Sequence, residues 1–330
     1  MSTTYAVERA PLPDHPDLEA VTLSSSKGLS VVFVPGAGMV GVSMVLDGVE
    51  LLGMREGLAG YLESGKTFGI PLLAPWANRL EVATFDGVEL VTDGIAGVRK
   101  DANGLPIHGL LAACPDWKVV HCEAVDSGKD KGAWLVAELT FDSKRPAFPA
   151  FPFPHRLGVS VRVRGRKVII ATTVEATGDR DVPVAFGWHP YFCPPNSDRS
   201  DWSVARPFVH HALLDDRSVP NGEVEHGAVE IDTLGDPAVG GRTYDDLYCD
   251  VPQGTTAWVE GGRHRISVTY DSGYPYAVLF APADQHLVAI EPMTAPTDPL
   301  AGYFPIRRVT PGNSFTAAFT IAVKGFGAAT

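Results

Sequence analysis

Cysteine and basic residues are scarce in this 330-residue chain, and each shortage excludes a class of protein. The four cysteines show no CxxC spacing, and so few in so long a chain do not make a disulfide framework, which favours a reducing, cytoplasmic compartment. Lysine and arginine total 27 against 39 aspartates and glutamates, a formal net charge of −12. A surface this acidic repels nucleic-acid phosphates and anionic lipid, so we expect neither nucleic acid nor a membrane as a partner.

Segments typical of membrane insertion or export are also lacking. The uncharged run from Gly28 to Leu46 is long enough to span a bilayer, but Pro35 and several glycines interrupt it. We predict two strands and a turn there. The first residues, MSTTYAVERAPLPDHPD, have neither the basic start nor the apolar core of a secretory signal.

Turn residues and two-residue alternation are what the chain has in abundance. Glycine and proline number 34 and 27, and both disfavour helices. Apolar residues alternate over 157–163 and again over 168–174, on either side of a turn, which predicts an antiparallel hairpin. The same pattern over 255–270 predicts a second hairpin, connected by Gly261-Gly262.

Helical periodicity is missing from the chain. No long stretch carries apolar residues at i, i+3, i+4 and i+7, so helices should be few and short. Asp86-Gly87, between two short strand-like runs, suits a primed two-residue turn. The proline-rich run 146–156 is interleaved with phenylalanines, which favours an anchored connection over an exposed PxxP ligand. With no linker, repeat or low-complexity tail, the sequence predicts one all-β domain over residues 1–330, built from packed antiparallel sheets.

Five short segments combine ionisable residues with aromatics and prolines. They are PWANRL (75–80), LPIHGL (105–110), FGWHPYF (186–192), TYDDLY (243–248) and AIEPMTAPTD (289–298). Ionisable groups are normally excluded from apolar surroundings unless they are paired or functional. Together these segments supply two histidines, a carboxylate and an Arg/Asp pair, which suits general acid and base chemistry and the binding of hydroxyls.

Each of these residues also has a purely structural interpretation. His108 alone is typical of a core histidine, Arg79 of an ion-pair partner, and Asp245 of a turn start. The aromatic surroundings of His189 suit either packing or a concave apolar wall with one titrating group. Glu291 ends an apolar run, where a carboxylate is costly unless it is paired or functional.

Common nucleophile, nucleotide and metal templates fail in this chain. There is no GxSxG, no P-loop, no GxGxxG after a strand, and neither HExxH nor HxH. His210 and His211 with His226 and Asp215 make a weak metal candidate that is more typical of a solvated loop. We therefore predict no metal site.

In this order the five segments resemble the motifs of the aldose 1-epimerase (galactose mutarotase-like) family. PWANRL resembles its Asn-Arg motif, LPIHGL its first His-Gly motif, FGWHPYF its second histidine motif, YDDLY its Asp motif and IEPMTAP its glutamate motif. The resemblance runs from about Pro71 to Asp298. It implies a β-supersandwich of antiparallel sheets with a sugar cleft, and an isomerase that interconverts the α and β anomers of an aldose without a cofactor.

The resemblance also assigns roles to individual residues. Glu291 would be the general base that takes the proton from the C1 hydroxyl, and His189 the general acid that protonates the ring oxygen and opens the pyranose. His108 would hydrogen-bond near the same ring oxygen. Arg79 and Asp245 would bind hydroxyls of the sugar.

Asn78 and Trp76 of the first motif complete the expected substrate-binding set. The aromatic residues of these motifs, Trp76 with Trp188 and Tyr191, either offer flat faces to the sugar or pack the wall of the cleft. Asp246 is the alternative sugar ligand to the first aspartate of the YDDLY motif, which the resemblance favours.

Departures from the family motifs bear on the substrate. Leu110 stands where galactose mutarotases usually have a second glycine, and the glutamate motif continues as EPMTAPTDPL without their usual Gln and Asp-Ala-x-Asn, which disfavours galactose. The hexose-6-phosphate epimerase branch has an arginine shortly after His-Gly, where this chain reads Leu-Leu-Ala-Ala-Cys, so an unphosphorylated sugar is favoured. A hexose-6-phosphate 1-epimerase and a non-catalytic carbohydrate-binding domain remain as alternatives.

Overall fold

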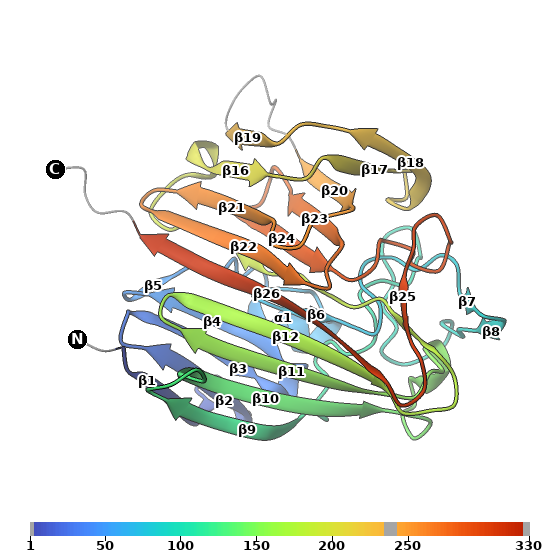
Figure 1. Cartoon of the computed structure of the whole chain (residues 1–330), viewed down its shortest axis with the longest axis horizontal. Coiled ribbons are helices and arrows are strands. Elements are labelled where there is room, and N and C mark those ends of the chain that lie inside the picture. The colour runs from blue at the N-terminus through green and yellow to red at the C-terminus, as the bar shows by residue number, and fades with distance from the viewer. Residues whose placement is uncertain (1–2, 234–242, 326–330) are drawn as a thin grey trace.

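The computed structural model describes residues 3–233 and 243–325, and strands dominate it (Figure 1). A five-stranded antiparallel sheet follows chain order and comprises β1 (Tyr5–Leu12), β2 (His15–Ser25), β3 (Leu29–Val34), β4 (Val40–Leu46) and β5 (Val49–Glu50). A nine-stranded sheet runs in the order β19 (Glu230–Thr233), β16 (Ser203–Arg206), β21 (Thr256–Gly261), β22 (His264–Ser272), β26 (Ser314–Gly325), β12 (Lys167–Ala176), β11 (His155–Arg164), β10 (Gly132–Phe141) and β9 (Lys118–Val125).

A third large sheet carries several of the segments singled out in the sequence. It runs in the order β18 (Pro220–His226), β17 (His210–Leu214), β20 (Tyr244–Cys249), β23 (Tyr276–Ala281), β24 (Val288–Met293), β14 (Gly187–Trp188) and β6 (Leu72–Leu73), with β15 (Tyr191–Phe192) also paired to β24. Two short ladders join β13 (Val182–Val184) to β25 (Arg307–Val309), and β7 (Thr84–Phe85) to β8 (Val88–Glu89). The helical elements of the described residues are α1 (Gly57–Ser64) and the 3₁₀ turns η1 (Pro35–Ala37), η2 (Phe148–Ala150) and η3 (Arg199–Asp201).

The hairpins form largely as the alternation predicts. β11 and β12 pair in continuous register from His155 to Arg164, and their inward-facing residues are buried, which confirms the first hairpin. Asp86 and Gly87 have φ values of 49° and 74°, as a primed turn requires, which confirms that prediction.

The predicted connection of the second hairpin is wrong by one residue. Gly261 still pairs with His264, so Gly262 and Arg263 form the turn. A Cβ on Gly261 would lie 2.4 Å from the indole of Trp202, so the glycine here serves close packing of a strand end against that ring and not a turn.

The sheets enclose a common core. Trp188 of the third sheet donates its indole N–H to Thr172 Oγ1 of the nine-stranded sheet at 3.0 Å, and its ring packs against Phe319. Val31 of the five-stranded sheet belongs to the same buried cluster as Leu157 of β11. Antiparallel sheets packed in this way confirm the expected all-β supersandwich.

Two further expectations concern unusual segments. The run from Gly28 to Leu46 forms β3, the η1 turn and β4, as predicted. In the proline-rich run Phe151 and Phe153 are buried and contact each other edge to face, which confirms an anchored connection. No helix within residues 3–233 and 243–325 has the length and apolar character needed to cross a bilayer.

Candidate active site

A carboxylate and an imidazole from separate segments touch on the third sheet. Glu291 lies within β24, and His189 lies between β14 and β15, which both pair with β24. This pairing brings Glu291 Oε1 within 3.0 Å of His189 Nε2. The backbone N–H of His189 donates to the carbonyl of Pro71 at 3.1 Å, which fixes the segment that carries the imidazole.

Burial controls the protonation of this pair. The side chains of His189 and Glu291 are only 6% and 1% exposed. Burial raises the pKa of Glu291 well above its ordinary value, with the nearby Asp245 carboxylate adding to the rise. Burial, together with the positive charge of Arg55, lowers the pKa of His189 to about 3. Burial disfavours the charged form of each group. The pair therefore shares one titratable proton over a wide range of pH, since Glu291 does not readily lose its proton and His189 does not readily gain a second one.

A tyrosine backs the imidazole of His189. The ring of Tyr191 stacks on that of His189 at 4.2 Å, and its hydroxyl lies 3.2 Å from His189 Nε2. The same hydroxyl contacts Thr67 Oγ1 at 2.6 Å and accepts a hydrogen bond from Arg55 Nη1 at 3.1 Å. Thr67 and Arg55 were missed in the sequence because they lie in no recognisable motif. Tyr191 was marked only as an aromatic residue, although its position two residues after His189 was the available signal.

His108 lies beside His189 on a loop with an unusual backbone. The two imidazole rings meet edge to face at 5.8 Å. His108 has a φ of 62°, Asn78 has a φ of 52°, and the backbone N–H of His108 donates to the carbonyl of Asn78 at 2.9 Å. Non-glycine residues in the left-handed region store strain and are enriched at functional sites.

The glycine of the His-Gly motif has a steric reason. Gly109 has a φ of 68°, and a Cβ on it would lie 2.1 Å from the carbonyl oxygen of Ala74. Only glycine therefore lets the loop of His108 pass against the segment of Asn78.

Arg79 is held by two acidic side chains. Its Nε lies 2.7 Å from Asp101 Oδ2, and its Nη1 lies 4.0 Å from Asp245 Oδ2. Burial raises the pKa of Asp101, but the hydrogen bonds from Arg79 and from the backbone of Leu105 together have the larger effect. The net pKa lies below its ordinary value, so this carboxylate is ionised. The Arg79–Asp245 edge is the more open side of the site, with 19% and 43% of these side chains exposed.

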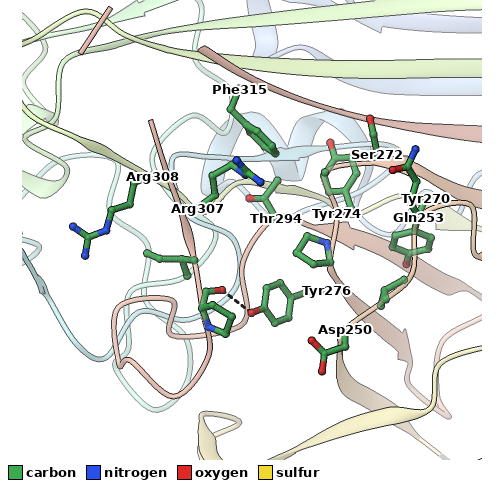
Figure 2. Close-up of a pocket in the computed structure, with 15 residues that line it drawn as sticks. Asp250, Gln253, Tyr270, Ser272, Tyr274, Tyr276, Thr294, Arg307, Arg308 and Phe315 are labelled. Atoms are coloured by element: carbon green, nitrogen blue, oxygen red, sulfur yellow. Dashed lines mark hydrogen bonds between the residues drawn. The ribbon is translucent and has the colours of Figure 1, made fainter. Parts of the chain in front are cut away.

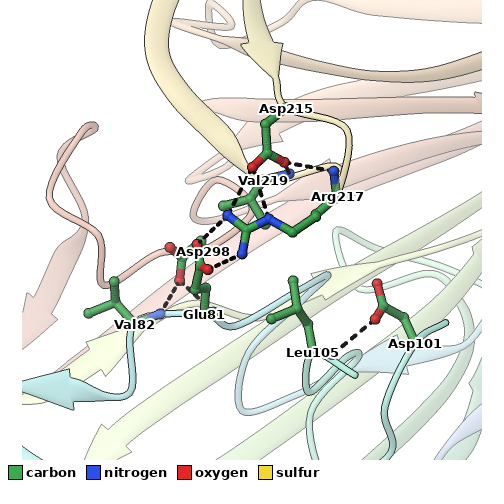
Figure 3. Close-up of polar contacts among 8 residues, drawn as sticks. All are labelled: Glu81, Val82, Asp101, Leu105, Asp215, Arg217, Val219 and Asp298. Carbon is green, nitrogen blue, oxygen red and sulfur yellow. Dashed lines mark hydrogen bonds and ion pairs between the residues drawn. The ribbon is translucent and has the colours of Figure 1, made fainter. Parts of the chain in front are cut away.

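The backbone that follows Arg79 is also fixed (Figure 3). Asp298 Oδ1 accepts hydrogen bonds from the backbone N–H groups of Glu81 and Val82 at 2.8 and 2.9 Å. The N–H of Asp298 in turn donates to the carbonyl of Arg79 at 2.8 Å. Arg217 joins Glu81 to Asp215, so the loop between β17 and β18 is tied to the same segment.

Strand register separates the two neighbouring aspartates of β20. Glu291 pairs with Val278, and Val278 pairs with Leu247, so Asp245 shares the face of Glu291 while Asp246 points to the opposite face. Tyr248 donates its hydroxyl to Asp246 at 3.1 Å on that opposite face. Geometry therefore groups Asp245 with the candidate site.

Buried polar atoms without partners converge at this site. Among the described residues, no hydrogen-bond partner is present for Asn78 Nδ2, His108 Nδ1, His189 Nδ1 or either carboxylate oxygen of Glu291. The contact between Glu291 and His189 is thus close but not aligned as a hydrogen bond. Unpaired buried polar atoms are costly and rare, and their concentration here marks a place that accommodates a polar ligand.

The tryptophans of the motifs pack in the core. The ring of Trp76 lies 6.4 Å from that of Phe151, and Trp188 bonds to Thr172 between the sheets. Both indoles belong to the large core cluster between the sheets. The face of Glu291 carries Met293 instead, and Ala77, the neighbour of Trp76, packs there. Neither indole therefore lies on the face of Glu291. Of the expected set, the structure thus brings together Glu291 and the two histidines with Asn78, Arg79 and Asp245, and leaves Trp76 outside.

Neither a metal-binding cluster nor a large cavity is found at this site among the described residues. No cluster of three or more His, Cys, Asp or Glu side chains suited to a metal is present in the described part of the chain. The rings of His210 and His226 contact each other, and His210 lies 3.3 Å from Asp250. A cavity of about 570 Å³ is lined by residues of β22 and β23 and of the neighbouring loops, and Glu291 is not among them (Figure 2).

Comparison with known proteins identifies the class to which this fold and site belong. The aldose 1-epimerase family model matches residues 19–322. The chain therefore belongs to the aldose 1-epimerase family, a family of carbohydrate epimerases. No curated protein matches the chain.

Solved structures show the same fold at low sequence identity. A galactose mutarotase-like protein from Clostridium acetobutylicum is 18% identical, with a TM-score of 0.80 over 98% of this chain and 99% of that one. The galactose 1-epimerase from Lactobacillus acidophilus NCFM is 14% identical, with a TM-score of 0.72 over 98% and 99% of the two chains. The GalM/aldose epimerase homologue from C. elegans is 15% identical, with a TM-score of 0.71 over 92% and 97%. At these identities the likeness establishes the fold alone.

Proposed function

We propose that this protein is an aldose 1-epimerase that interconverts the α and β anomers of an aldose by general acid/base ring opening. The observation that carries the proposal is the 3.0 Å contact between Glu291 Oε1 and His189 Nε2 in a buried site with unpaired polar atoms. Mutarotation needs one proton acceptor and one proton donor, and this pair supplies both. Because C1 has the same oxidation state in the hemiacetal and in the open-chain aldehyde, the reaction calls for no redox cofactor.

The proton shared by the pair sets the catalytic cycle. The raised pKa of Glu291 and the lowered pKa of His189 favour a protonated Glu291 beside a neutral His189 when no ligand is bound. A carboxylate beside an imidazolium contains the same number of protons, so the two forms differ only in where that proton lies. Hydroxyl groups of a bound sugar stabilise the charged form by hydrogen bonds, which makes Glu291 the base and His189 the acid.

Ring opening then follows from the positions of these two groups. Glu291 takes the proton of the C1 hydroxyl while His189 protonates the ring oxygen, and the C1–O5 bond breaks to give the open-chain aldehyde. Rotation about C1–C2 presents the other face of the carbonyl, and the two groups reverse their roles on closure. His108 donates or accepts a hydrogen bond near the ring oxygen, according to its tautomer.

Binding of the remaining hydroxyls falls to the polar rim. Arg79 and Asp245 are the partly exposed members of the site and suit hydroxyls that reach the open side. Asn78 Nδ2 is a buried donor that requires an acceptor. The carboxylate of Glu291 is itself fully buried, so a sugar reaches it only when neighbouring side chains shift, and the catalytic hydrogen bonds form in that complex. A single mutarotase-like domain over residues 1–330 is part of the same proposal.

A hexose-6-phosphate 1-epimerase is the second candidate, and two arginines favour it. Arg55 donates to Thr67 and Tyr191, and Arg99 donates to the carbonyl of His108 at 3.3 Å. Neither guanidinium has an ion-pair partner among the described residues. The sequence argument against a phosphate rested on the stretch after His-Gly alone, and Arg55 and Arg99 lie outside that stretch.

Polarimetry on both substrate classes tests the proposal. Wild-type protein is added to freshly dissolved α-anomers of several free aldoses and hexose 6-phosphates, and the rate of approach to equilibrium is followed. We expect acceleration with at least one aldose, and a loss of about three orders of magnitude in Glu291→Gln. Calorimetric binding of a sugar with rates at the buffer level across the panel would instead identify a carbohydrate-binding domain.

A further inference from the structure

A cavity separate from the acid/base pair is lined by aromatic and charged side chains. Its volume is about 570 Å³, within the range of pockets that hold small molecules. The walls come from the turn after β20, the ends of β22 and β23, the segment leading into β25 and the start of β26 (Figure 2). None of the residues assigned to the proposed active site lines it.

The walls of this cavity are fixed by internal hydrogen bonds. Tyr276 donates its hydroxyl to the carbonyl of Pro305 at 2.7 Å, and Thr294 donates to the carbonyl of Phe186 at 2.7 Å. Tyr270 donates to the carbonyl of Glu291 at 3.3 Å, so one wall rests against the strand that carries the proposed base. A cavity bounded by such fixed groups is preorganised, because a ligand does not have to order them.

Two consecutive arginines border the cavity in different ways. Arg308 forms an ion pair with Asp86 and lies over the ring of Phe85 at 4.6 Å. Arg307 lies over the ring of Phe315 at 4.9 Å and forms no ion pair with any carboxylate of the described residues. The ring orients the Arg307 guanidinium without neutralising it. In Figure 2 Arg307 lies among the lining side chains beside Phe315, whereas Arg308 extends away from them.

The one carboxylate that borders the cavity, Asp250, lies across Tyr276 from Arg307 (Figure 2). Its Oδ2 lies 3.3 Å from His210 Nδ1, which forms an ion pair with it only when the imidazole is protonated. The Arg307 side chain is exposed and has no ion-pair partner among the described residues, so its guanidinium is available to an anion at close range, although the net charge of −12 opposes anions at long range. The side chains of Ser272 and Gln253 are at least partly open to solvent and offer hydrogen bonds to the rest of a small polar molecule, while the buried tyrosine rings form the floor behind them.

We propose that this cavity binds a small organic anion, a carboxylate or phosphate carried on a sugar-sized body, with the anionic group on Arg307. The body of the ligand lies against the side chains of Gln253 and Ser272. A guanidinium binds either anion through paired N–H donors, and the cavity is large enough for a hexose acid or a hexose phosphate.

Calorimetry with matched arginine variants tests this site. Wild-type protein, Arg307→Ala, Arg308→Ala and Arg79→Ala are titrated with D-glucuronate, D-glucose 6-phosphate, inorganic phosphate and D-glucose. We expect at least one anion to bind, about tenfold more weakly to Arg307→Ala and unchanged to Arg308→Ala and Arg79→Ala. Comparison of glucuronate with the two phosphates identifies the anionic group that is preferred.

Three results would overturn the proposal. They are the absence of binding by every anion, an equal loss in Arg307→Ala and Arg308→Ala, and a loss in Arg79→Ala that shows the anion sits in the proposed active site. Phe315→Leu, which removes the ring under Arg307, provides an independent variant and is expected to weaken the same anion. Unchanged D-glucose binding in Arg307→Ala separates this cavity from the site of Glu291.

Discussion

Asp101 holds Arg79 by one carboxylate oxygen and the loop of His108 by the other. Its Oδ2 lies 2.7 Å from Arg79 Nε, while its Oδ1 accepts hydrogen bonds from the backbone N–H groups of Asn103 and Leu105 at 2.9 and 3.0 Å. One carboxylate, whose side chain is only 9% exposed, therefore sets the position of a proposed sugar ligand relative to a proposed catalytic imidazole.

Replacement of Asp101 by alanine tests this coupling. Arg79 loses its partner and the loop of His108 loses two hydrogen bonds, so we expect KM for the aldose to rise about tenfold while kcat falls less. Steady-state polarimetry separates the two constants. Asp93→Ala is the matched control, because Asp93 pairs with Lys100 nearby in the same part of the chain but is exposed; an equal change in both variants would contradict the coupling.

Glu291→Gln is expected to inactivate the protein and also to stabilise it. Burial raises the pKa of Glu291, so the wild-type protein loses stability as pH rises from about 4.5 through that raised value, whereas glutamine stays neutral. We expect the free energy of unfolding of the variant to exceed that of the wild type by about 1–3 kcal/mol at pH ~8, and the difference to vanish near pH ~4. Urea unfolding at several pH values measures it, with exposed Glu89→Gln as control. A variant less stable than wild type at alkaline pH would be the contrary result.

The pH dependence of kcat/KM reports on the shared proton. His189 with a pKa of about 3 gains its second proton only in strong acid, and Glu291 loses the shared proton as pH rises through its raised pKa. We therefore expect kcat/KM to stay level as pH falls through the ordinary histidine value of about 6.5, and to decline on the alkaline side. An acid limb near pH ~6.5 would show that His189 titrates as an ordinary histidine.

Tyr191→Phe isolates the hydroxyl that backs His189. The variant keeps the stacked ring but loses the contacts of that hydroxyl with Thr67, Arg55 and His189. We expect kcat to fall about tenfold, and the free energy of unfolding to fall by about 1–3 kcal/mol because Thr67 and Arg55 lose a buried partner. Tyr303→Phe is the control, because Tyr303 is exposed. Equal kcat values for the two variants would remove Tyr191 from the catalytic apparatus.

Gly109→Ala should be far more damaging than Gly104→Ala in the same loop. Both glycines have positive φ, at 68° and 79°, but a Cβ at Gly109 meets the carbonyl of Ala74 at 2.1 Å, while nothing lies within 4 Å at Gly104. We expect a cost of about 1 kcal/mol at Gly104 and several at Gly109, measured by urea unfolding. Similar losses at the two positions would show that backbone strain alone, and not the close approach, determines the cost.

Much of the fold was predictable because β structure leaves a local signal. Alternation over β11 and β12 predicts their pairing, and Asp86-Gly87 predicts its turn, since both depend on neighbours in sequence. Gly261 was wrongly predicted to lie in a turn. A glycine is needed there because the strand packs against the distant ring of Trp202, which no local pattern reveals.

The residues that the structure groups at the candidate site were predictable where they lie in motifs. Glu291, His189, His108 and Arg79 could be named from their segments, and alternation along β20 separates Asp245 from its neighbour once register is known. Asp101, Thr67 and Arg55 could not be found, because a carboxylate, a hydroxyl and a guanidinium on separate loops acquire a role only through tertiary contact. For Trp76 the motif offered two roles, and only the packing against Phe151 distinguishes them.

The position of β26 has a consequence for how the chain acquires its structure. This strand, the last one described, lies between β12 and β22 in the nine-stranded sheet (Figure 1). During synthesis β12 and β22 each have one edge without a partner strand until residues 314–325 leave the ribosome and can pair with them. Because the pairing partners are far apart in sequence, this part of the sheet closes slowly and late, so we expect nascent chains to depend on protection from aggregation until β26 is available to pair.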